Sequence, residues 1–208
     1  MGVQTVLQRQ GLAAPISLPS PAPKFYTDFA HPSDIDLWGV DSGTWTHPLP
    51  TRVYRGRESA ASCGSYFTVG SWEDMVIEVW VYPKDNVIAN FYLAGINLLR
   101  QNADNNYFLW FLYDYRGTST VHELRLGAYS GGAFHHWIIY HGLNFVNIPY
   151  TWYKIGVRKR GNSYTVWVTD KVNRDVVNGT DPTPLFVEGG VGLIAYGCEV
   201  DFKDFLVR

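Results

Sequence analysis

The stretch that decides the fold is the closing one, residues 189–208, which reads GGVGLIAYGCEVDFKDFLVR. It contains two strand-like runs, residues 191–196 and 199–207, on either side of Gly197 and Cys198. In the second run apolar and polar side chains alternate, which is typical of a strand with one buried side. The alternation separates two sets: Val200, Phe202 and, after a phase slip at Asp204 and Phe205, Leu206 on one face, and Asp201 and Lys203 on the other. The sequence therefore predicts a closing β-hairpin with one buried face.

The rest of the chain consists of short apolar runs separated by turn residues. Residues 75–82 alternate most clearly, with the odd-numbered positions from Met75 to Val81 on the face that should be buried. Gly161 and Asn162 mark a tight hairpin, because both residue types tolerate positive φ. No run has a helical period, and a series of such strands is typical of two packed antiparallel sheets. The prediction is an all-β fold, a two-sheet antiparallel β-sandwich of the jelly-roll type.

Length and composition suit one large domain that is rich in aromatic side chains. Of the 208 residues, 46% are hydrophobic and 17% are charged, which is enough apolar material for a substantial core. Aromatic residues make up 16% of the chain, with 14 Tyr, 11 Phe and 8 Trp. Aromatic side chains fit pleated strands, but so many of them also predict exposed rings of the kind that stack on sugars.

Charge distribution and the length of apolar runs argue against nucleic acid as a partner and against a membrane span. The net charge is −2, and Lys and Arg are scattered except at residues 154–160, so the basic stripe expected of a nucleic-acid-binding protein is missing. No apolar run reaches the roughly 18 residues of a membrane span. The first ten residues lack the basic and apolar regions of a secretory signal, so the compartment stays open, with an extracellular surface or a virion among the choices.

Residues 1–24 differ from everything that follows. Four prolines between Pro15 and Pro23 exclude a helix or a central strand there. We expect an extended arm that lies on its own domain or on a neighbouring subunit, because such a segment cannot bury itself. The prediction is a single sandwich domain over residues 25–208, with the arm as a contact in a homo-oligomer or larger assembly.

The two cysteines, Cys63 and Cys198, are far apart in the sequence and have no metal-ligand spacing. Two interpretations stay open: a pair of buried free thiols, or a disulfide that joins an early strand to the closing stretch. Free thiols are favoured, because no signal peptide points to an oxidising compartment.

Both ends of the domain resemble a known superfamily. VGLIA at residues 191–195 followed by FKDFLV at 202–207 is similar to the closing strands of concanavalin A-like and laminin-G-like β-sandwiches. FYTDF at 25–29 and LWGVDSGTW at 37–45 resemble their opening strand and the Trp-containing segment after it. The resemblance implies a sandwich of the kind found in lectins and glucanases, and therefore a binding architecture, without indicating the ligand.

The same resemblance implies a structural calcium ion. Sandwiches of this kind often hold one at the rim with an Asp of the first strand and an Asp of the last, which in this chain are Asp28 and Asp201 or Asp204. Carboxylates supplied by loops suit this cation. The alternative is that these three side chains simply face solvent.

The aromatic residues predict a sugar-binding surface. Flat rings can cover the apolar face of a pyranose while neighbouring charged groups bind its hydroxyls. The predicted ligand-binding residues, which combine both kinds of side chain, are Trp80, Tyr82, Trp110, Asp114, Arg125, Trp137, Arg158 and Trp167. Strand alternation does not decide which sheet face is concave, and a packed protein interface would use the same residue types.

No catalytic residues are predicted. Glycoside hydrolysis needs two carboxylates roughly 5–10 Å apart. The carboxylates closest in sequence are neighbours that point to opposite faces of a strand, which leaves a cross-strand pair of Glu78 and Glu123 as a candidate. His135 and His136 are also neighbours, so a regular strand would point them apart and keep them from binding one zinc ion.

The sequence therefore predicts a non-catalytic, lectin-like module that binds a glycan or acts in adhesion, as part of a larger assembly. A second class is a structural subunit of a virion, filament or surface layer, in which residues 1–24 contact neighbouring subunits. A glycoside hydrolase is the third. The fold alone does not choose among them.

Overall fold

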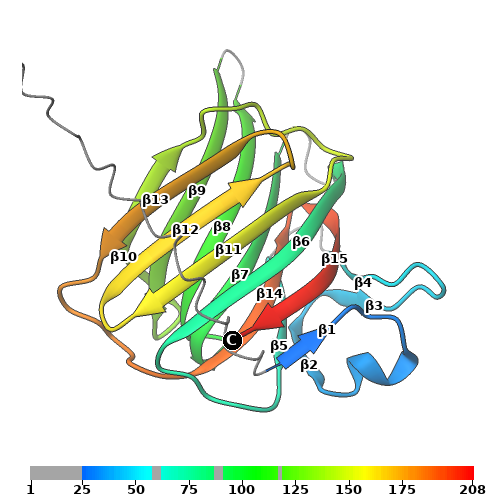
Figure 1. Ribbon diagram of the computed structural model, residues 1–208, viewed down its shortest axis with the longest axis horizontal. Helices are drawn as coiled ribbons and strands as arrows, with labels where there is room; N and C mark the ends of the chain where they lie inside the picture. The colour runs from blue at the N-terminus through cyan, green and yellow to red at the C-terminus, as the bar shows by residue number, and fades with distance from the viewer. Residues whose placement is uncertain (1–24, 58–61, 87–90, 117–118) are drawn as a thin grey trace, which may run out of the picture.

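The computed structural model describes residues 25–57, 62–86, 91–116 and 119–208. These residues form two antiparallel β-sheets that pack face to face (Figure 1), so the predicted all-β sandwich is confirmed. The predicted arm, residues 1–24, lies outside the described residues, and the division into an arm and one domain over residues 25–208 therefore stays a prediction.

The sheet nearer the viewer in Figure 1 has eight strands. In spatial order they are β13 (Arg174–Thr180), β12 (Ser163–Thr169), β11 (Tyr153–Arg160), β6 (Met75–Asn86), β15 (Cys198–Val207), β4 (Tyr54–Arg57) and β3 (Thr44–Thr46), and β1 (Phe25–Thr27) also pairs with β15. The predicted tight hairpin joins β11 to β12, and Gly161 has a φ of 53° in its turn.

The second sheet has seven strands. In spatial order they are β10 (Ala133–Gly142), β9 (Ser119–Ser130), β8 (Asn105–Arg116), β7 (Phe91–Asn102), β14 (Gly190–Tyr196), β5 (Ser62–Phe67) and β2 (Trp38–Ser42). One short 3-10 helix, η1 (Pro32–Ile35), precedes β2 within the described chain. The carboxylate of Asp34 accepts a hydrogen bond from the His31 backbone N–H at 2.9 Å and so closes this turn.

Every second side chain of the central strands lies between the two sheets. In β6 the side chains of Ile77, Val79 and Val81 are fully buried, as the alternation predicts. Tyr92 and Leu109 of the seven-stranded sheet belong to the same core cluster. Each large apolar side chain buried in this way contributes about 1.5–3 kcal/mol to stability. The core therefore uses one face of each sheet, and the outer faces are available for other roles.

The closing stretch does not form the predicted hairpin. β14 pairs with β5 and β7 in the seven-stranded sheet, whereas β15 pairs with β4 and β6 in the eight-stranded sheet. Gly197, with a φ of 71°, lies in the short turn that carries the chain from one sheet to the other. Because each strand has hydrogen-bonding partners on both sides, its backbone groups are satisfied without the other strand.

The predicted phase slip in β15 exists, but its outcome differs from the prediction. The pairing with β6 is irregular between Lys203 and Leu206, and Asp204 has a φ of 51° there. An extra residue of this kind shifts the alternation by one position. After the slip Phe205 and Val207 are fully buried, and Leu206 is not.

The first and last strands of the described domain are neighbours, since Phe25 pairs with Val207. Cys63 and Cys198 are both buried free thiols, which was the favoured interpretation. Burial raises the pKa of the Cys198 thiol to about 12. The part of the chain that the structure describes has no helix long and apolar enough to cross a membrane.

Candidate functional site

The eight predicted ligand-binding residues fall on two opposite faces of the sandwich. The outer face of the seven-stranded sheet carries Trp110, Asp114, Arg125 and Trp137. The outer face of the eight-stranded sheet carries Trp80, Tyr82, Arg158 and Trp167. All of them point outward because their neighbours along each strand fill the core. The predicted set is therefore two separate groups.

A groove of about 860 Å³ lies on the outer face of the seven-stranded sheet. Residues of β7, β8, β9 and β14 line it, together with residues of β2, β5 and two turns. Three of the predicted residues, Trp110, Asp114 and Arg125, are among them. The volume is within the range of small-ligand sites in proteins, which is roughly 300–1,000 Å³.

Strand register brings the groove residues together. Gly95 of β7 pairs with Trp110 of β8, Trp110 pairs with Arg125 of β9, and Arg125 pairs with Tyr140 of β10. Directly opposite side chains in an antiparallel sheet lie about 5 Å apart, so these four residues form one row. A side chain at Gly95 would put its Cβ 2.5 Å from the Leu109 carbonyl oxygen. Glycine is therefore required there, and it leaves the row open beside the Trp110 indole.

Four rings, Phe108, Trp110, Tyr129 and Trp137, form what we call the outer aromatic cluster. The Phe108 ring is fully buried, and its centroid lies 4.2 Å from that of Trp110, 4.9 Å from Tyr129 and 5.6 Å from Trp137. The Trp110 and Trp137 rings meet edge to face at 5.7 Å. Mutual packing holds these rings in place, so a ligand would meet a surface that is already ordered. Burial raises the pKa of the Tyr129 phenol, which keeps this hydroxyl neutral.

Arg125 is held in position by three neighbours. Its guanidinium forms an ion pair with Glu123 and donates a hydrogen bond to the Tyr140 hydroxyl at 2.8 Å. Its Cζ atom also lies 5.5 Å from the centre of the Trp137 ring. Because Glu123 compensates its charge, Arg125 offers oriented N–H donors rather than a net positive charge.

Further polar groups of the groove come from β7 and β8. Asp114 and Asn97 are both 7% exposed and line the groove. Asn106 lines it as well and donates a hydrogen bond from Nδ2 to the Ala103 carbonyl at 2.8 Å. Within the described residues, the Asn97 amide makes no side-chain hydrogen bond. The Asn97 amide is not among the fully enclosed unpaired groups of the described residues, so a ligand hydroxyl in the groove can hydrogen-bond to it.

Sequence reasoning missed Phe108, Asn106 and Asn97. Phe108 and Asn106 share strand alternation with Trp110, so the pattern of β8 contains the signal that would have found them. Asn97 lies in a strand that is buried along most of its length, and alternation along β7 gives no sign of which side faces a ligand.

The predicted residues on the eight-stranded sheet have different surroundings. The Trp167 ring lies flat against Gly156 of the adjacent strand, where a Cβ would come within 2.3 Å of the indole. Trp167 therefore covers the backbone of β11. Arg158 is exposed and donates to the Thr165 hydroxyl at 3.3 Å. The Trp80 ring lies near three lysines and the Tyr82 ring near one, Lys84.

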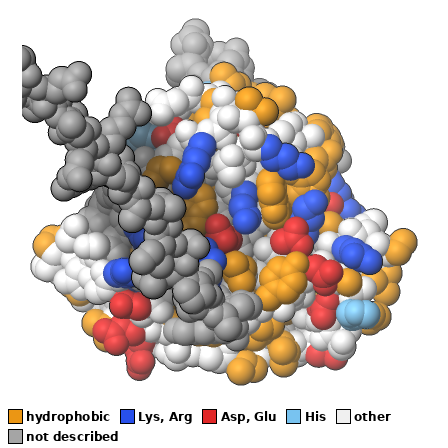
Figure 2. Space-filling view, viewed as in Figure 1, with side chains coloured by type: hydrophobic (Ala, Val, Ile, Leu, Met, Phe, Trp, Pro, Cys, Tyr) orange, Lys and Arg blue, Asp and Glu red, His pale blue; other side chains and the backbone are white. Residues whose placement is uncertain are grey.

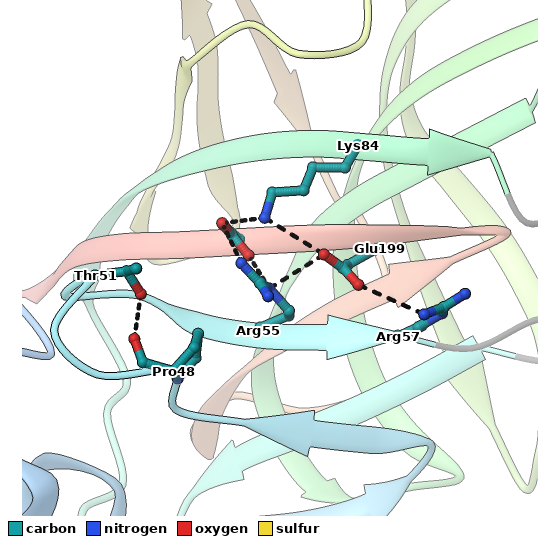
Figure 3. A network of polar contacts seen from close by, with 7 residues as sticks. Pro48, Thr51, Arg55, Arg57, Lys84 and Glu199 are labelled. Atoms are coloured by element: carbon teal, nitrogen blue, oxygen red, sulfur yellow. Dashed lines mark hydrogen bonds and ion pairs between the residues drawn. The ribbon is translucent and has the colours of Figure 1, made fainter.

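Asp201, one of the predicted calcium ligands, already has cationic partners, Arg55 and Lys84, both of which are labelled in Figure 3. Arg55 binds its two carboxylate oxygens at 2.6 and 3.1 Å, and Lys84 Nζ lies 2.7 Å from Oδ2. Glu199 extends the network, with Oε1 3.2 Å from Arg55 Nε and 3.3 Å from Lys84 Nζ. The hydrogen bonds to Asp201 raise the pKa of Arg55. The Asp201 charge is therefore neutralised by protein groups.

The other two predicted calcium ligands, Asp28 and Asp204, lie near the Tyr26 hydroxyl. Tyr26 donates a hydrogen bond to Asp204 Oδ1 at 3.1 Å. Partial burial, this hydrogen bond and the charges of both carboxylates raise the pKa of Tyr26 to about 12. Among the described residues, no group of three or more His, Cys, Asp or Glu side chains is arranged to hold a metal ion.

Two expectations about chemical groups are corrected by the structure. Glu78 lies in the eight-stranded sheet and Glu123 in the seven-stranded sheet, so they cannot form a carboxylate pair across one glycosidic bond. The predicted separation of His135 and His136 is wrong, since their Nδ1 atoms lie 2.7 Å apart. An irregularity in β10 between Phe134 and His136 breaks the strict alternation there.

The amino-acid sequence matches no known protein family and no curated protein sequence. Several solved structures, by contrast, are similar over most of their length. The carbohydrate binding module CBM66 from Bacillus subtilis has a TM-score of 0.66 at 16% identity, and 83% of this chain and 95% of that one are covered. The CBM2 module of the evolved Dit of Lactobacillus casei BL23 phage J-1 has a TM-score of 0.63 at 13% identity, with 88% and 93% covered.

The exoplasmic/lumenal domain of VIP36, solved with Ca²⁺ and Man3GlcNAc bound, has a TM-score of 0.65 at 9% identity, with 89% and 90% covered. Similarity at such low identity concerns the fold. This protein has the concanavalin A-like β-sandwich fold that the terminal motifs predict.

Proposed function

We propose that this protein is a non-catalytic carbohydrate-binding module and that the groove on the seven-stranded sheet is its ligand site. The observation that carries the proposal is the convergence of three rings of the outer aromatic cluster with Asn97, Asp114 and Arg125 in one groove; these rings are Phe108, Trp110 and Tyr129. The fold is shared with carbohydrate-binding modules and with a domain solved with an oligosaccharide, which supports the same class.

The groove suits neutral sugars. Its aromatic rings can cover the apolar face of a pyranose, while Asn97 and Asp114 bind hydroxyls. The charge of Arg125 is compensated by Glu123, and Asp41 at the rim pairs with Arg100. A charged sugar would therefore find no uncompensated cation among these groups.

A glycan array tests the proposal. The wild-type protein is expected to bind one class of neutral glycan, and Trp110→Ala is expected to weaken that binding roughly 10–30-fold, because it removes a central aromatic contact. Trp167→Ala is the matched control, since it removes an indole from the opposite sheet. Absence of binding to any neutral glycan, or an equal loss in both variants, would overturn the proposal, provided that circular dichroism shows both variants folded.

The two other function classes, a structural subunit and a glycoside hydrolase, stay predictions. A structural subunit would use residues 1–24, which lie outside the described residues. A hydrolase would need Asp114 and Glu123, which are diagonal neighbours on β8 and β9 and therefore about 7–8 Å apart. Glu123 forms an ion pair with Arg125, so this carboxylate is already engaged by a protein cation, whereas hydrolysis needs two carboxyl groups that are available to the substrate. This pairing favours binding over hydrolysis.

The calcium ion implied by the resemblance is retained in the proposal with Asp28 and Asp204 as its ligands. Asp201 is bound by Arg55 and Lys84 at 2.6 and 2.7 Å, whereas the cation near Asp28, Arg52, is exposed and 3.9 Å away. Calcium needs six to eight oxygen ligands, so backbone carbonyls and water would complete the shell. Treatment with EDTA is expected to lower the melting temperature, and added calcium to restore it. The double variant Asp28→Asn/Asp204→Asn should not respond. An unchanged transition in the wild-type protein would contradict this part of the proposal.

A further inference from the structure

The outer face of the eight-stranded sheet has a lysine-rich aromatic surface around Trp80. The Nζ atoms of Lys154, Lys171 and Lys203 lie 5.9, 5.6 and 6.0 Å from the centre of the Trp80 ring. Figure 2 shows basic side chains spread over this face among hydrophobic and acidic ones. Three ammonium groups around one indole form a cation–π arrangement. Packing of the tryptophan against the sheet does not require these lysines.

Strand register creates this arrangement. Lys154 of β11 and Lys203 of β15 both pair with Trp80 of β6, so the indole has a lysine on each side. Lys171 reaches the same ring from the turn between β12 and β13. The strands on the two sides of β6 are about 10 Å apart, so the two flanking ammonium groups can contact successive units of an extended chain.

A second aromatic group continues the surface. Lys203 Nζ lies 4.1 Å from the centre of the Trp152 ring, and Trp152 lies 5.0 Å from Tyr82. Lys203 therefore stands between Trp80 and Trp152. Along this line, a ligand would meet an aromatic ring, a cation and a second aromatic ring.

The lysines of this surface differ in whether they have a carboxylate partner. Lys154 has an acidic partner, Glu78, at 3.7 Å, and Lys84 is bound by Asp201 and Glu199. Within the described residues, Lys171 and Lys203 have no carboxylate partner. Residues 1–24 contain no Asp or Glu, so that part of the chain cannot neutralise them either.

We propose that this surface, centred on Trp80, Trp152, Lys171 and Lys203, is a second carbohydrate site that binds an acidic polysaccharide built from uronic-acid sugars. The indoles stack on the sugar rings, and the two unpaired ammonium groups bind carboxylates. A uronate chain has one charge per sugar, which matches two unpaired lysines next to two rings. A sulfated glycan or a nucleic acid carries more charge than this surface compensates. The site is on the opposite sheet from the groove and does not depend on it.

Affinity measurements with polygalacturonate test the proposal, with dextran as the neutral probe and dextran sulfate and double-stranded DNA as densely charged probes. The wild-type protein is expected to bind polygalacturonate, to bind more weakly at higher salt, and not to bind dextran at this surface. The double variant Lys171→Gln/Lys203→Gln and the variant Trp80→Ala should each lower the affinity for polygalacturonate at least about 10-fold.

Two controls separate this site from other effects. The charge control Arg52→Gln/Arg160→Gln removes two positive charges from exposed positions. Arg160 is roughly 20 Å along β11 from Lys154. This variant should leave the affinity for polygalacturonate nearly unchanged. Trp110→Ala should weaken neutral-glycan binding in the groove and leave polygalacturonate binding intact. An equal loss in the charge control, no binding of polygalacturonate, or tighter binding of dextran sulfate or DNA with the same dependence on Lys203 would overturn the proposal.

Discussion

Replacing Asp201 with alanine is expected to lower the free energy of unfolding by about 3 kcal/mol. Asp201 is 5% exposed and binds Arg55 through both carboxylate oxygens and Lys84 through one. Removing it leaves two partly buried cations with only Glu199 as an acidic partner (Figure 3). Breaking a buried ion pair costs about 3–5 kcal/mol, and the remaining carboxylate and the partial exposure of the cations place this variant at the lower end.

Urea unfolding measures this loss, and Asp204→Ala is the matched control on the same strand. Asp204 accepts a hydrogen bond from Tyr26, an exposed side chain, and has a positive φ that alanine adopts less readily, so the change should cost about 1–2 kcal/mol when calcium is removed by a chelator. The double variant Asp201→Leu/Arg55→Met should recover part of the stability that Asp201→Ala loses, because fewer charges are left without a partner. A cost for Asp201→Ala no larger than that of Asp204→Ala would show that the network contributes little.

The variant Phe108→Ala is expected to destabilise the protein by about 3 kcal/mol and to abolish neutral-glycan binding. Phe108 is fully buried on the outer side of the seven-stranded sheet, where it packs against Trp110, Tyr129 and Trp137. Truncation removes the contact that the three partly exposed rings share. Because the groove is next to the ring, water and neighbouring side chains can fill part of the cavity, so the cost is at the lower end for Phe→Ala changes.

Phe108→Leu separates stability from binding. It preserves most of the buried volume and should cost less than about 1.5 kcal/mol, while the aromatic contacts to Trp110 are lost. Chemical denaturation and titration of the array-selected glycan measure the two effects on the same preparations. If Phe108→Ala kept full glycan affinity, the outer aromatic cluster would not be the structure that holds the ligand-facing rings.

The class of fold could be predicted from the sequence because it depends on local regularities. Alternation in residues 75–82 predicted which side chains of β6 fill the core, and the structure buries them. The motifs at both ends indicated a concanavalin A-like sandwich, and the similar solved structures have that fold. The same alternation correctly marked Trp80, Trp110, Arg125 and Trp167 as facing away from the core.

Pairing between distant strands could not be predicted in the same way. β14 and β15 follow each other along the chain and were expected to pair, yet they lie in different sheets. Nothing in the alternation of either strand records its partners, because alternation specifies a side of a strand and not a neighbour. The bulge at Asp204, which buries Phe205 instead of Leu206, depends likewise on how β15 pairs with β6.

In the candidate sites, too, some features could be predicted from the sequence and others depend on strand pairing. The sequence by itself determined the fold class, the buried face of each regular strand and the residue types that point outward, since these depend on period-two alternation and composition. Only the tertiary structure decided that Trp110 and Arg125 share a groove with Asn97, while Trp80 lies among lysines on the opposite sheet. The physical reason is that neighbours on a sheet face come from hydrogen bonding between segments that are distant in the chain. Such pairing is set by the packing of the whole sandwich.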